Sequence, residues 1–183
     1  ALKSHLASGG SAANTIHGLA MLNAKTGFIG SVGRDNTGDF FENDLKNAGV
    51  ETMLFRHDSA TGTAVALISP DSERTFATHL GAAVELRSED LNISLFKKYD
   101  ILYLEGYLIN DLPFFEKACS LAKENNMKIA IDLASFNVVN ARLDDFKSVI
   151  RTYADIVFAN EEEARSYTGM EPEEALKAIA GQC

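Results

Sequence analysis

The stretch Gly9–Phe41, GGSAANTIHGLAMLNAKTGFIGSVGRDNTGDFF, contains two glycine motifs whose spacing decides the fold. In the first motif, Gly9 and Gly10 precede a predicted helix that begins at Ser11, and Asn14 lies one turn into it. Paired glycines let a ligand approach the backbone, a helix start offers unpaired N–H groups, and an amide both donates and accepts hydrogen bonds. These features suit a small molecule rich in hydroxyl groups. The alternative is a turn followed by an N-cap, which needs no ligand.

The second motif, G-x-V-G-x-D-x-x-G at residues 30–38, follows a short predicted strand and precedes a predicted helix that ends near residue 48. We interpret Asp35 within it as a cap of that helix or a brace of its loop, outside the catalytic set. The same order of strand, glycine and helix also allows a dinucleotide-binding oxidoreductase domain, with Glu51 as the ribose-binding acid. Val32 occupies a place where the dinucleotide motif requires glycine, which counts against this alternative.

The rest of the sequence alternates predicted strands and helices, which indicates βαβ units and a parallel sheet. Buried strands are predicted at residues 101–105, 128–132 and 155–159, and helices at residues 91–97, 113–125, 143–153 and 161–168. Between residues 50 and 80 the pattern changes to a strand at 50–55 and a hairpin at 62–79. These strands form either a separate small sheet or antiparallel edge strands of the main sheet.

Polar residues follow three of the predicted parallel strands, at the edge where such sheets bind ligands. Glu105 ends the first strand and is either an acceptor for ligand hydroxyl groups or a solvated loop acid. Asp132 ends the second strand and is interpreted as a site residue that acts indirectly, by orienting the loop that follows this strand. Asn160 and Glu163 follow the third strand with the N-x-x-E spacing of a capping box, which stabilises a helix start without any ligand.

Composition limits the classes of function. The chain has 183 residues, 46% of them hydrophobic, and a formal net charge of −9, which argues against a nucleic-acid backbone or an anionic membrane as partner. Apolar runs are far shorter than a membrane span, and Cys119 and Cys183 have no metal or redox spacing, so a cytoplasmic location is expected. His17, His57 and His79 have no spacing typical of a metal site or a catalytic triad.

The two glycine motifs together resemble the N-terminal signature of the PfkB, or ribokinase-like, family of sugar and nucleoside kinases. The resemblance implies a three-layer α/β/α core with a mostly parallel sheet and a small β-sheet lid, whose strands we expect within residues 50–80. We expect one domain over residues 1–183. Family members are longer at both ends, and this chain begins at Ala1 and stops at Cys183 just after a predicted helix, so we expect a fragment.

The resemblance also implies an activity, the ATP-dependent phosphorylation of a hydroxymethyl group of a sugar or ribonucleoside, with Mg²⁺. The small residue after the glycine pair is closer to adenosine kinases than to ribokinases. On the acceptor side, contacts with the small-molecule substrate are implied for Gly9, Gly10, Ser11, Asn14, Gly81, Ala82 and Glu105, although Gly81 is also interpretable as a turn residue.

On the nucleotide side, the resemblance implies that Asn160 contacts phosphate groups and that Glu163 orders Mg²⁺ through water. The catalytic base of the family is an aspartate in a G-A-G-D motif near the C-terminus. This chain has no such motif, so no catalytic residue is assigned within it. The resemblance also allows a homodimer formed through the lid, and a non-catalytic sugar- or nucleoside-binding relative is a further alternative.

Overall fold

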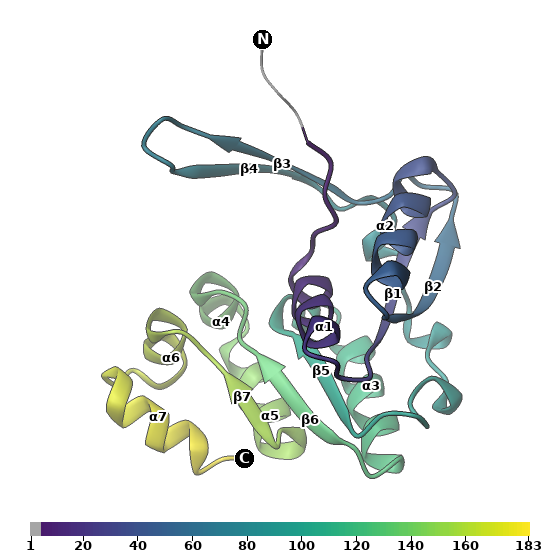
Figure 1. Ribbon diagram of the computed structural model, residues 1–183. Helices are drawn as coiled ribbons and strands as arrows, with labels where there is room; N and C mark the ends of the chain where they lie inside the picture. The colour runs from purple at the N-terminus through teal and green to yellow at the C-terminus, as the bar shows by residue number, and fades with distance from the viewer. Residues whose placement is uncertain (1–4) are drawn as a thin grey trace. The chain divides into compact units, whose positions relative to one another are not determined.

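The computed structural model describes residues 5–183, and of Arg74 only the backbone. The chain divides into two compact units, Ala1–Leu86 and Arg87–Cys183. Both units contain parallel strands joined by helices, which confirms the predicted α/β fold class (Figure 1). The single domain expected over residues 1–183 stays a prediction.

The first unit is organised around one β-α-β element. Strands β1 (Gly27–Gly33) and β2 (Glu51–His57) pair in parallel, and α2 (Asn36–Asn47) connects them and contacts both. The helix α1 (Ser11–Met21) precedes β1. Aromatic packing joins β1 to α2, because the rings of Phe28 and Phe41 meet edge to face with their centroids 5.6 Å apart. The predicted order of helix, strand, helix and strand is confirmed.

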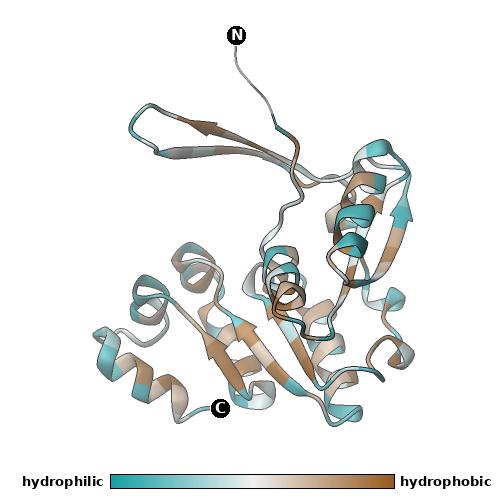
Figure 2. Ribbon diagram, in the orientation of Figure 1, coloured by the Kyte–Doolittle hydropathy of each residue, from teal (hydrophilic) through white to brown (hydrophobic). Residues whose placement is uncertain are grey.

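The predicted hairpin forms a two-stranded antiparallel sheet of its own, made of β3 (Thr63–Ile68) and β4 (Arg74–His79). It extends as a long arm away from β1 and β2 (Figure 1), and Figure 2 shows apolar residues along β3. Residues 50–55, the other segment expected in the lid, lie largely in β2 and therefore in the parallel pair. The lid role of the hairpin stays a prediction. Four of its apolar side chains are more than half exposed: Val65, Leu67, Ile68 and Phe76.

The second unit contains a three-stranded parallel sheet in the order β5-β6-β7. The bounds of β5 (Ile101–Glu105) and β6 (Lys128–Asp132) coincide with the predicted ranges. The third strand, β7 (Ile156–Phe158), is one residue shorter at each end than predicted. Because residues alternate between the two faces of a strand, the sheet has one buried apolar face and one face that carries polar residues. The buried strand residues include Leu104, Ile129 and Ile131.

Helices cover the apolar face of this sheet. The helix α3 (Leu112–Glu124) leads from β5 to β6 and contacts both strands, and α5 (Leu143–Tyr153) lies between β6 and β7 in the sequence and contacts α3. Their apolar sides supply large buried side chains, which pack at close to crystal density and fix the position of the strands. The fully buried helix residues include Phe115, Cys119, Phe146 and Ile150.

The remaining helices show two differences from the prediction. Residues 91–97, predicted as a helix, form only the short 3₁₀ turn η3 (Ile93–Leu95), preceded by η2 (Ser88–Asp90). A further helix, α4 (Phe136–Ala141), was not predicted, because its two valines and two asparagines have low helix propensity. The other elements are η1 (Gly81–Val84), η4 (Gly106–Asn110), α6 (Glu161–Thr168) and α7 (Pro172–Ala180).

The carboxylate of Asp155, just before β7, forms hydrogen bonds with residues of β6 and α3. Because these contacts need its negative charge, the stability of the fold is expected to depend on pH. Asp155 accepts hydrogen bonds from Lys123 and Lys128, each at 2.8 Å, and from the Ile129 N–H at 2.9 Å. These lysines hold the pKa of Asp155 well below its ordinary value. Since the pKa is lowered in the folded state, the stabilisation is complete above the ordinary value of 3.8 and is lost as the pH falls through it towards the lower folded pKa.

Asp155→Asn is therefore expected to lower the free energy of unfolding at pH 7 by about 1 kcal/mol, a modest effect because solvent screens the partly exposed lysines. Urea unfolding at pH 7, 5 and 3 checks this, and the difference between the two proteins is expected to shrink at pH 3. Asp144→Asn, at an exposed position of α5, is the matched control. A difference that stays constant down to pH 3 would contradict the role of the Asp155 charge.

Candidate functional site

The three predicted strand-end positions gather at one edge of the second unit's sheet. Glu105 ends β5 and Asp132 ends β6, and the strand register sets these two residues opposite each other. Asn160 follows β7, which is the next strand of the same sheet. The carboxyl ends of parallel strands meet at one edge, so the sequence correctly predicted that these residues lie on the same side of the fold.

Tyr103 links the two carboxylates. Its hydroxyl oxygen lies 2.9 Å from Oε1 of Glu105 and 3.3 Å from Oδ2 of Asp132. Its position two residues before Glu105 places both side chains on one face of β5. Sequence reasoning missed this residue, although the Tyr-x-Glu spacing is a signal that could have found it.

Glu105 is buried but not fully hydrogen-bonded. Its residue is 5% exposed, and its Oε2 atom meets no hydrogen-bond donor within residues 5–183. The alternative of a solvated loop acid is therefore wrong. A buried carboxylate oxygen without a donor costs free energy, and a native fold keeps such an atom most readily where a ligand supplies the donor.

Asp132 holds the turn that follows β6. Its Oδ1 atom accepts a hydrogen bond of 2.7 Å from the N–H of Ala134. Ala134 has a φ of +65°, a left-handed conformation that costs free energy for a residue with a side chain. The contact agrees with the expected orienting role, while the part of Asp132 in a ligand site stays a prediction.

Asn160 and Glu163 form the capping box that their spacing indicates. The Asn160 side chain accepts from the Glu163 N–H at 2.9 Å, and Glu163 accepts from the Asn160 N–H at 2.9 Å and from its Nδ2 at 2.8 Å. Glu163 is 6% exposed, and Gly169 ends α6 in the left-handed conformation. The capping interpretation is confirmed, and the contacts with phosphate and Mg²⁺ stay predictions.

Asn160 also lines a groove of about 330 Å³ between β7 and the two helices that follow it. Apolar side chains supply most of its other walls, so the groove as a whole is not built to hold phosphate. They include Val157, Ala164, Leu176 and Ile179.

The predicted acceptor-side residues of the first unit lie at the start of α1. Gly10 is the N-cap residue with a φ of 103°, a conformation that favours glycine, and Ser11 is the first residue of the helix. No side chain caps this helix, and Gly9, Gly10, Ser11 and Asn14 are all exposed. A Cβ added to Gly9 would meet no atom of residues 5–183 within 4 Å. Open space for a ligand is present, and the contact with substrate stays a prediction.

Gly81 and Ala82 pack against the chain near Ala60. The Ala82 N–H donates to the Ala60 carbonyl at 2.8 Å, and a Cβ on Gly81 would collide with that same carbonyl oxygen. Ala82 is fully buried. This packing accounts for the glycine as a turn residue at the start of η1, and the predicted contacts of Gly81 and Ala82 with substrate stay predictions.

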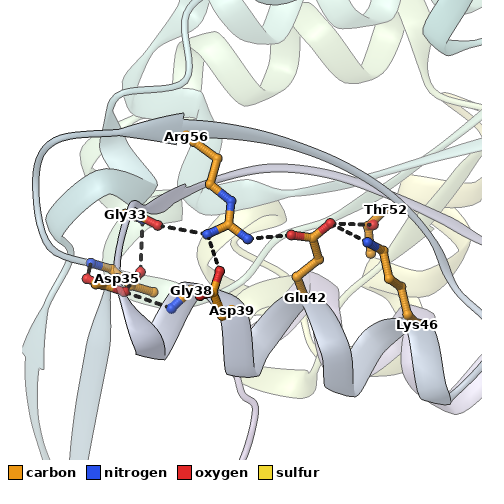
Figure 3. A network of polar contacts seen from close by, with 9 residues as sticks. Gly33, Asp35, Gly38, Asp39, Glu42, Lys46, Thr52 and Arg56 are labelled. Carbon is orange, nitrogen blue, oxygen red and sulfur yellow. Dashed lines mark hydrogen bonds and ion pairs between the residues drawn. The ribbon is translucent and has the colours of Figure 1, made fainter.

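The second glycine motif is held together by Asp35 (Figure 3). Its carboxylate caps α2 by accepting from the Gly38 N–H at 2.7 Å, and it accepts from the Thr61 hydroxyl at 2.6 Å and the Thr61 N–H at 2.8 Å. A Cβ on Gly38 would lie 2.6 Å from the Gly33 carbonyl oxygen, so the loop closes only around glycine. The structural interpretation of Asp35 is confirmed.

The same geometry makes the dinucleotide alternative wrong. The Asp35 side chain occupies the N-terminus of α2, where a pyrophosphate would have to bind. Glu51 pairs with Gly27 at the amino ends of the two parallel strands, roughly 20 Å from the start of α2 at about 3.3 Å per residue. A ribose-binding acid is needed at the opposite end of β2.

His57 has two polar partners that lie far away in the sequence. Its Nε2 lies 3.3 Å from the Ser31 hydroxyl, and its Nδ1 lies 3.0 Å from a carboxylate oxygen of Glu85. Ser31 lies within β1 and is 8% exposed. The contacts therefore tie the two strands to the residue after η1.

No three His, Cys, Asp or Glu side chains within residues 5–183 gather closely enough to hold a metal ion. None of the described helices has both the length and the apolar composition that a membrane crossing requires. The predicted site residues are thus grouped within each unit: Glu105, Asp132, Asn160 and Glu163 in one, and Gly9, Gly10, Ser11, Asn14, Gly81 and Ala82 in the other.

Comparison with known proteins identifies the family. Residues 3–182 match the family model described as pfkB family carbohydrate kinase. The 5-dehydro-2-deoxygluconokinase of Clostridium beijerinckii is 30% identical over 167 residues, which are 85% of this chain and 49% of that protein. The adenosine kinase of Saccharomyces cerevisiae is 30% identical over 168 residues, 88% of this chain and 49% of that protein.

The fold comparison agrees. The crystal structure of adenosine kinase from Sinorhizobium meliloti has a TM-score of 0.87 to this chain at 31% identity, and the match covers 97% of this chain and 56% of that one. The chain spans about half the length of the curated relatives it matches. It therefore belongs to the PfkB family of carbohydrate kinases and has the ribokinase-like α/β fold.

Proposed function

We propose that the protein containing this chain transfers the terminal phosphoryl group of ATP to a hydroxymethyl group of a sugar or nucleoside. The observation that carries the proposal is the Oε2 atom of Glu105, which is buried at the carboxyl edge of a parallel sheet and has no donor within residues 5–183. A hydroxyl of the acceptor molecule would supply that donor. Family membership and two kinase relatives of known name support the reaction class.

Contacts with the acceptor are proposed for each unit by itself. In the second unit, Glu105 accepts a hydrogen bond from an acceptor hydroxyl. In the first unit, the uncapped start of α1 at Gly10 offers N–H donors to oxygens of the acceptor. Asn14 adds an amide that donates and accepts. Holding the acceptor in line with the phosphoryl donor is the main work of a kinase, because phosphoryl transfer needs little covalent chemistry from the protein. Further contacts are assigned to Gly9, Ser11, Gly81 and Ala82.

The nucleotide side is assigned to Asn160 and Glu163. Each carboxylate oxygen of Glu163 accepts one hydrogen bond from Asn160, which leaves each a further lone pair for a water molecule. An anionic carboxylate that reaches a cation through water suits Mg²⁺, which keeps most of its waters. When bound, ATP would supply the transferred phosphoryl group, and Mg²⁺ would offset the negative charge of the phosphates. The base that takes the proton of the attacking hydroxyl is assigned to an aspartate outside this chain.

The proposal is tested with the complete protein, incubated with Mg²⁺–ATP and a panel of acceptors. The panel contains 5-dehydro-2-deoxygluconate, ribose and adenosine, because a 5-dehydro-2-deoxygluconokinase, a ribokinase and an adenosine kinase are among the similar proteins. Transfer of labelled phosphate to one acceptor is expected. Binding of an acceptor without transfer of phosphate would contradict the proposed kinase activity and favour the alternative of a non-catalytic binding protein. A homodimer through the hairpin and a cytoplasmic location stay predictions.

Glu163→Gln separates the capping role of this residue from its proposed role at the nucleotide. Glutamine has a single acceptor oxygen, so it keeps the hydrogen bond from the Asn160 N–H and loses the one from Nδ2, and the free energy of unfolding is expected to fall by about 1 kcal/mol. Loss of the charge is expected to lower kcat/KM for ATP about tenfold while the KM of the acceptor stays unchanged. Glu162→Gln, at an exposed position of the same helical turn, is the control. Equal kinetics of the two variants would remove Glu163 from the nucleotide site.

A further inference from the structure

The hydroxyl of Tyr103 lies between the two strand-end carboxylates. It is 2.9 Å from Oε1 of Glu105 and 3.3 Å from Oδ2 of Asp132, so both acceptors compete for one proton. The shorter distance favours donation to Glu105. The tyrosine ring is itself supported, because it packs against Phe158 of β7 with the centroids 6.2 Å apart.

The two carboxylates are held close by the backbone. The register of β5 and β6 sets Glu105 opposite Asp132. Immediately after Glu105, the chain passes so close to β6 that a Cβ on Gly106 would lie 2.6 Å from the Asp132 carbonyl oxygen. The backbone of Glu105 therefore has little freedom to withdraw. Like charges at neighbouring strand positions repel each other, so a donor between them is needed to keep the Glu105 side chain in one orientation.

We infer that Tyr103 is a positioning residue: it holds Oε1 of Glu105 and thereby directs Oε2 towards the acceptor hydroxyl. The inference rests on the proposed function, in which Glu105 contacts the acceptor. The two oxygens of Glu105 have separate tasks. Oε1 is engaged by Tyr103, and Oε2, buried and without a donor in residues 5–183, is left for the ligand. Tyr103 itself need not contact the acceptor.

Tyr103→Phe in the complete protein tests the inference, because phenylalanine keeps the ring and its packing and removes only the hydroxyl. The KM of the acceptor is expected to rise about tenfold, the effect of one hydrogen bond to a charged group, while the KM of ATP stays the same. Tyr153→Phe is the matched control and is expected to leave both constants unchanged, because Tyr153 ends α5 just before β7 and so belongs to the amino edge of the sheet, opposite the edge of Glu105 and Asp132.

A double-mutant cycle separates positioning from a merely structural role. In a Glu105→Leu background, Tyr103→Phe is expected to have no further effect on kcat/KM for the acceptor, because the carboxylate it positions is gone. Additive losses, or an equal rise in the KM of both substrates, would overturn the inference. An unchanged acceptor KM in Tyr103→Phe, with the unmodified protein active, overturns the inference alone. Absence of transfer by the unmodified protein overturns the proposed function and the inference together.

Discussion

Glu105→Leu in the complete protein is expected to lower kcat/KM for the phosphoryl acceptor by about a hundredfold, the largest effect on activity that the structure predicts. The proposed site asks Glu105 to accept a hydrogen bond from an acceptor hydroxyl through Oε2. Leucine fills a similar volume but offers no acceptor, so the hydroxyl would lose its partner in a buried environment. Steady-state kinetics with each substrate varied in turn measure the effect, and the KM of ATP is expected to stay the same.

The free energy of unfolding of Glu105→Leu is expected to rise or to stay the same, although its activity falls. The folded chain buries a carboxylate that is 5% exposed and has one oxygen without a donor in residues 5–183. Leucine removes the buried carboxylate and its unpaired oxygen, while the Tyr103 hydroxyl, which loses Oε1 of Glu105, still has Oδ2 of Asp132 at 3.3 Å as an acceptor. Thermal unfolding of Glu105→Leu is thus expected at an unchanged or higher Tm.

Two further variants sharpen this prediction. Glu105→Gln keeps the shape and an acceptor but removes the charge, so an intermediate loss of about tenfold is expected. Glu173→Ala removes an exposed carboxylate from the first turn of α7 and is the control for a change in net charge. Loss of activity together with a clear drop in Tm in Glu105→Leu would show that Glu105 serves the fold, and would contradict the proposal.

The parallel strands of the second unit could be predicted from the sequence almost to the residue. Residues 101–105 and 128–132 are short apolar runs that end in an acid, and both ends are marked by polar residues. A strand of a buried parallel sheet reads as a nearly continuous apolar run, so the composition of the sequence indicates where the strand begins and ends. The region around residues 91–97 was harder, because four apolar residues within a short polar stretch fit a helix and a pair of 3₁₀ turns equally well.

The candidate site was predictable where a single strand end determines a position. Glu105, Asp132 and Asn160 each follow a strand, and parallel pairing brings them to one edge. The contact of Tyr103 with Glu105 could have been predicted from their Tyr-x-Glu spacing, but its contact with Asp132 could not, because it depends on side-chain direction across two strands. The partners of His57 were missed for the same reason: Ser31 and Glu85 are 26 and 28 residues away in the sequence, and local spacing carries no sign of such contacts.

Asp35→Ala is expected to lower the free energy of unfolding by about 3 kcal/mol, the largest effect on stability that the structure predicts. The variant removes the cap of α2 and both hydrogen bonds to Thr61. Those bonds, first the one from the Thr61 hydroxyl, lower the pKa of Asp35. The stabilisation is therefore complete above the ordinary pKa of an aspartate, 3.8, and is lost as the pH falls through that value towards the lower folded pKa.

Asp39→Ala is the matched control for the loss of Asp35, because it removes an acid from the same helix. Asp39 forms an ion pair of 2.6 Å with Arg56, but its side chain is 61% exposed, so a loss of only about 0.5 kcal/mol is expected. Arg56 also keeps its second partner, Glu42 (Figure 3). Urea unfolding of both variants at pH 7 and pH 3 measures the difference. Similar losses at pH 7 would show that the Asp35 carboxylate contributes no more than a surface charge, and that the glycine motif closes by the packing of Gly33 and Gly38 alone.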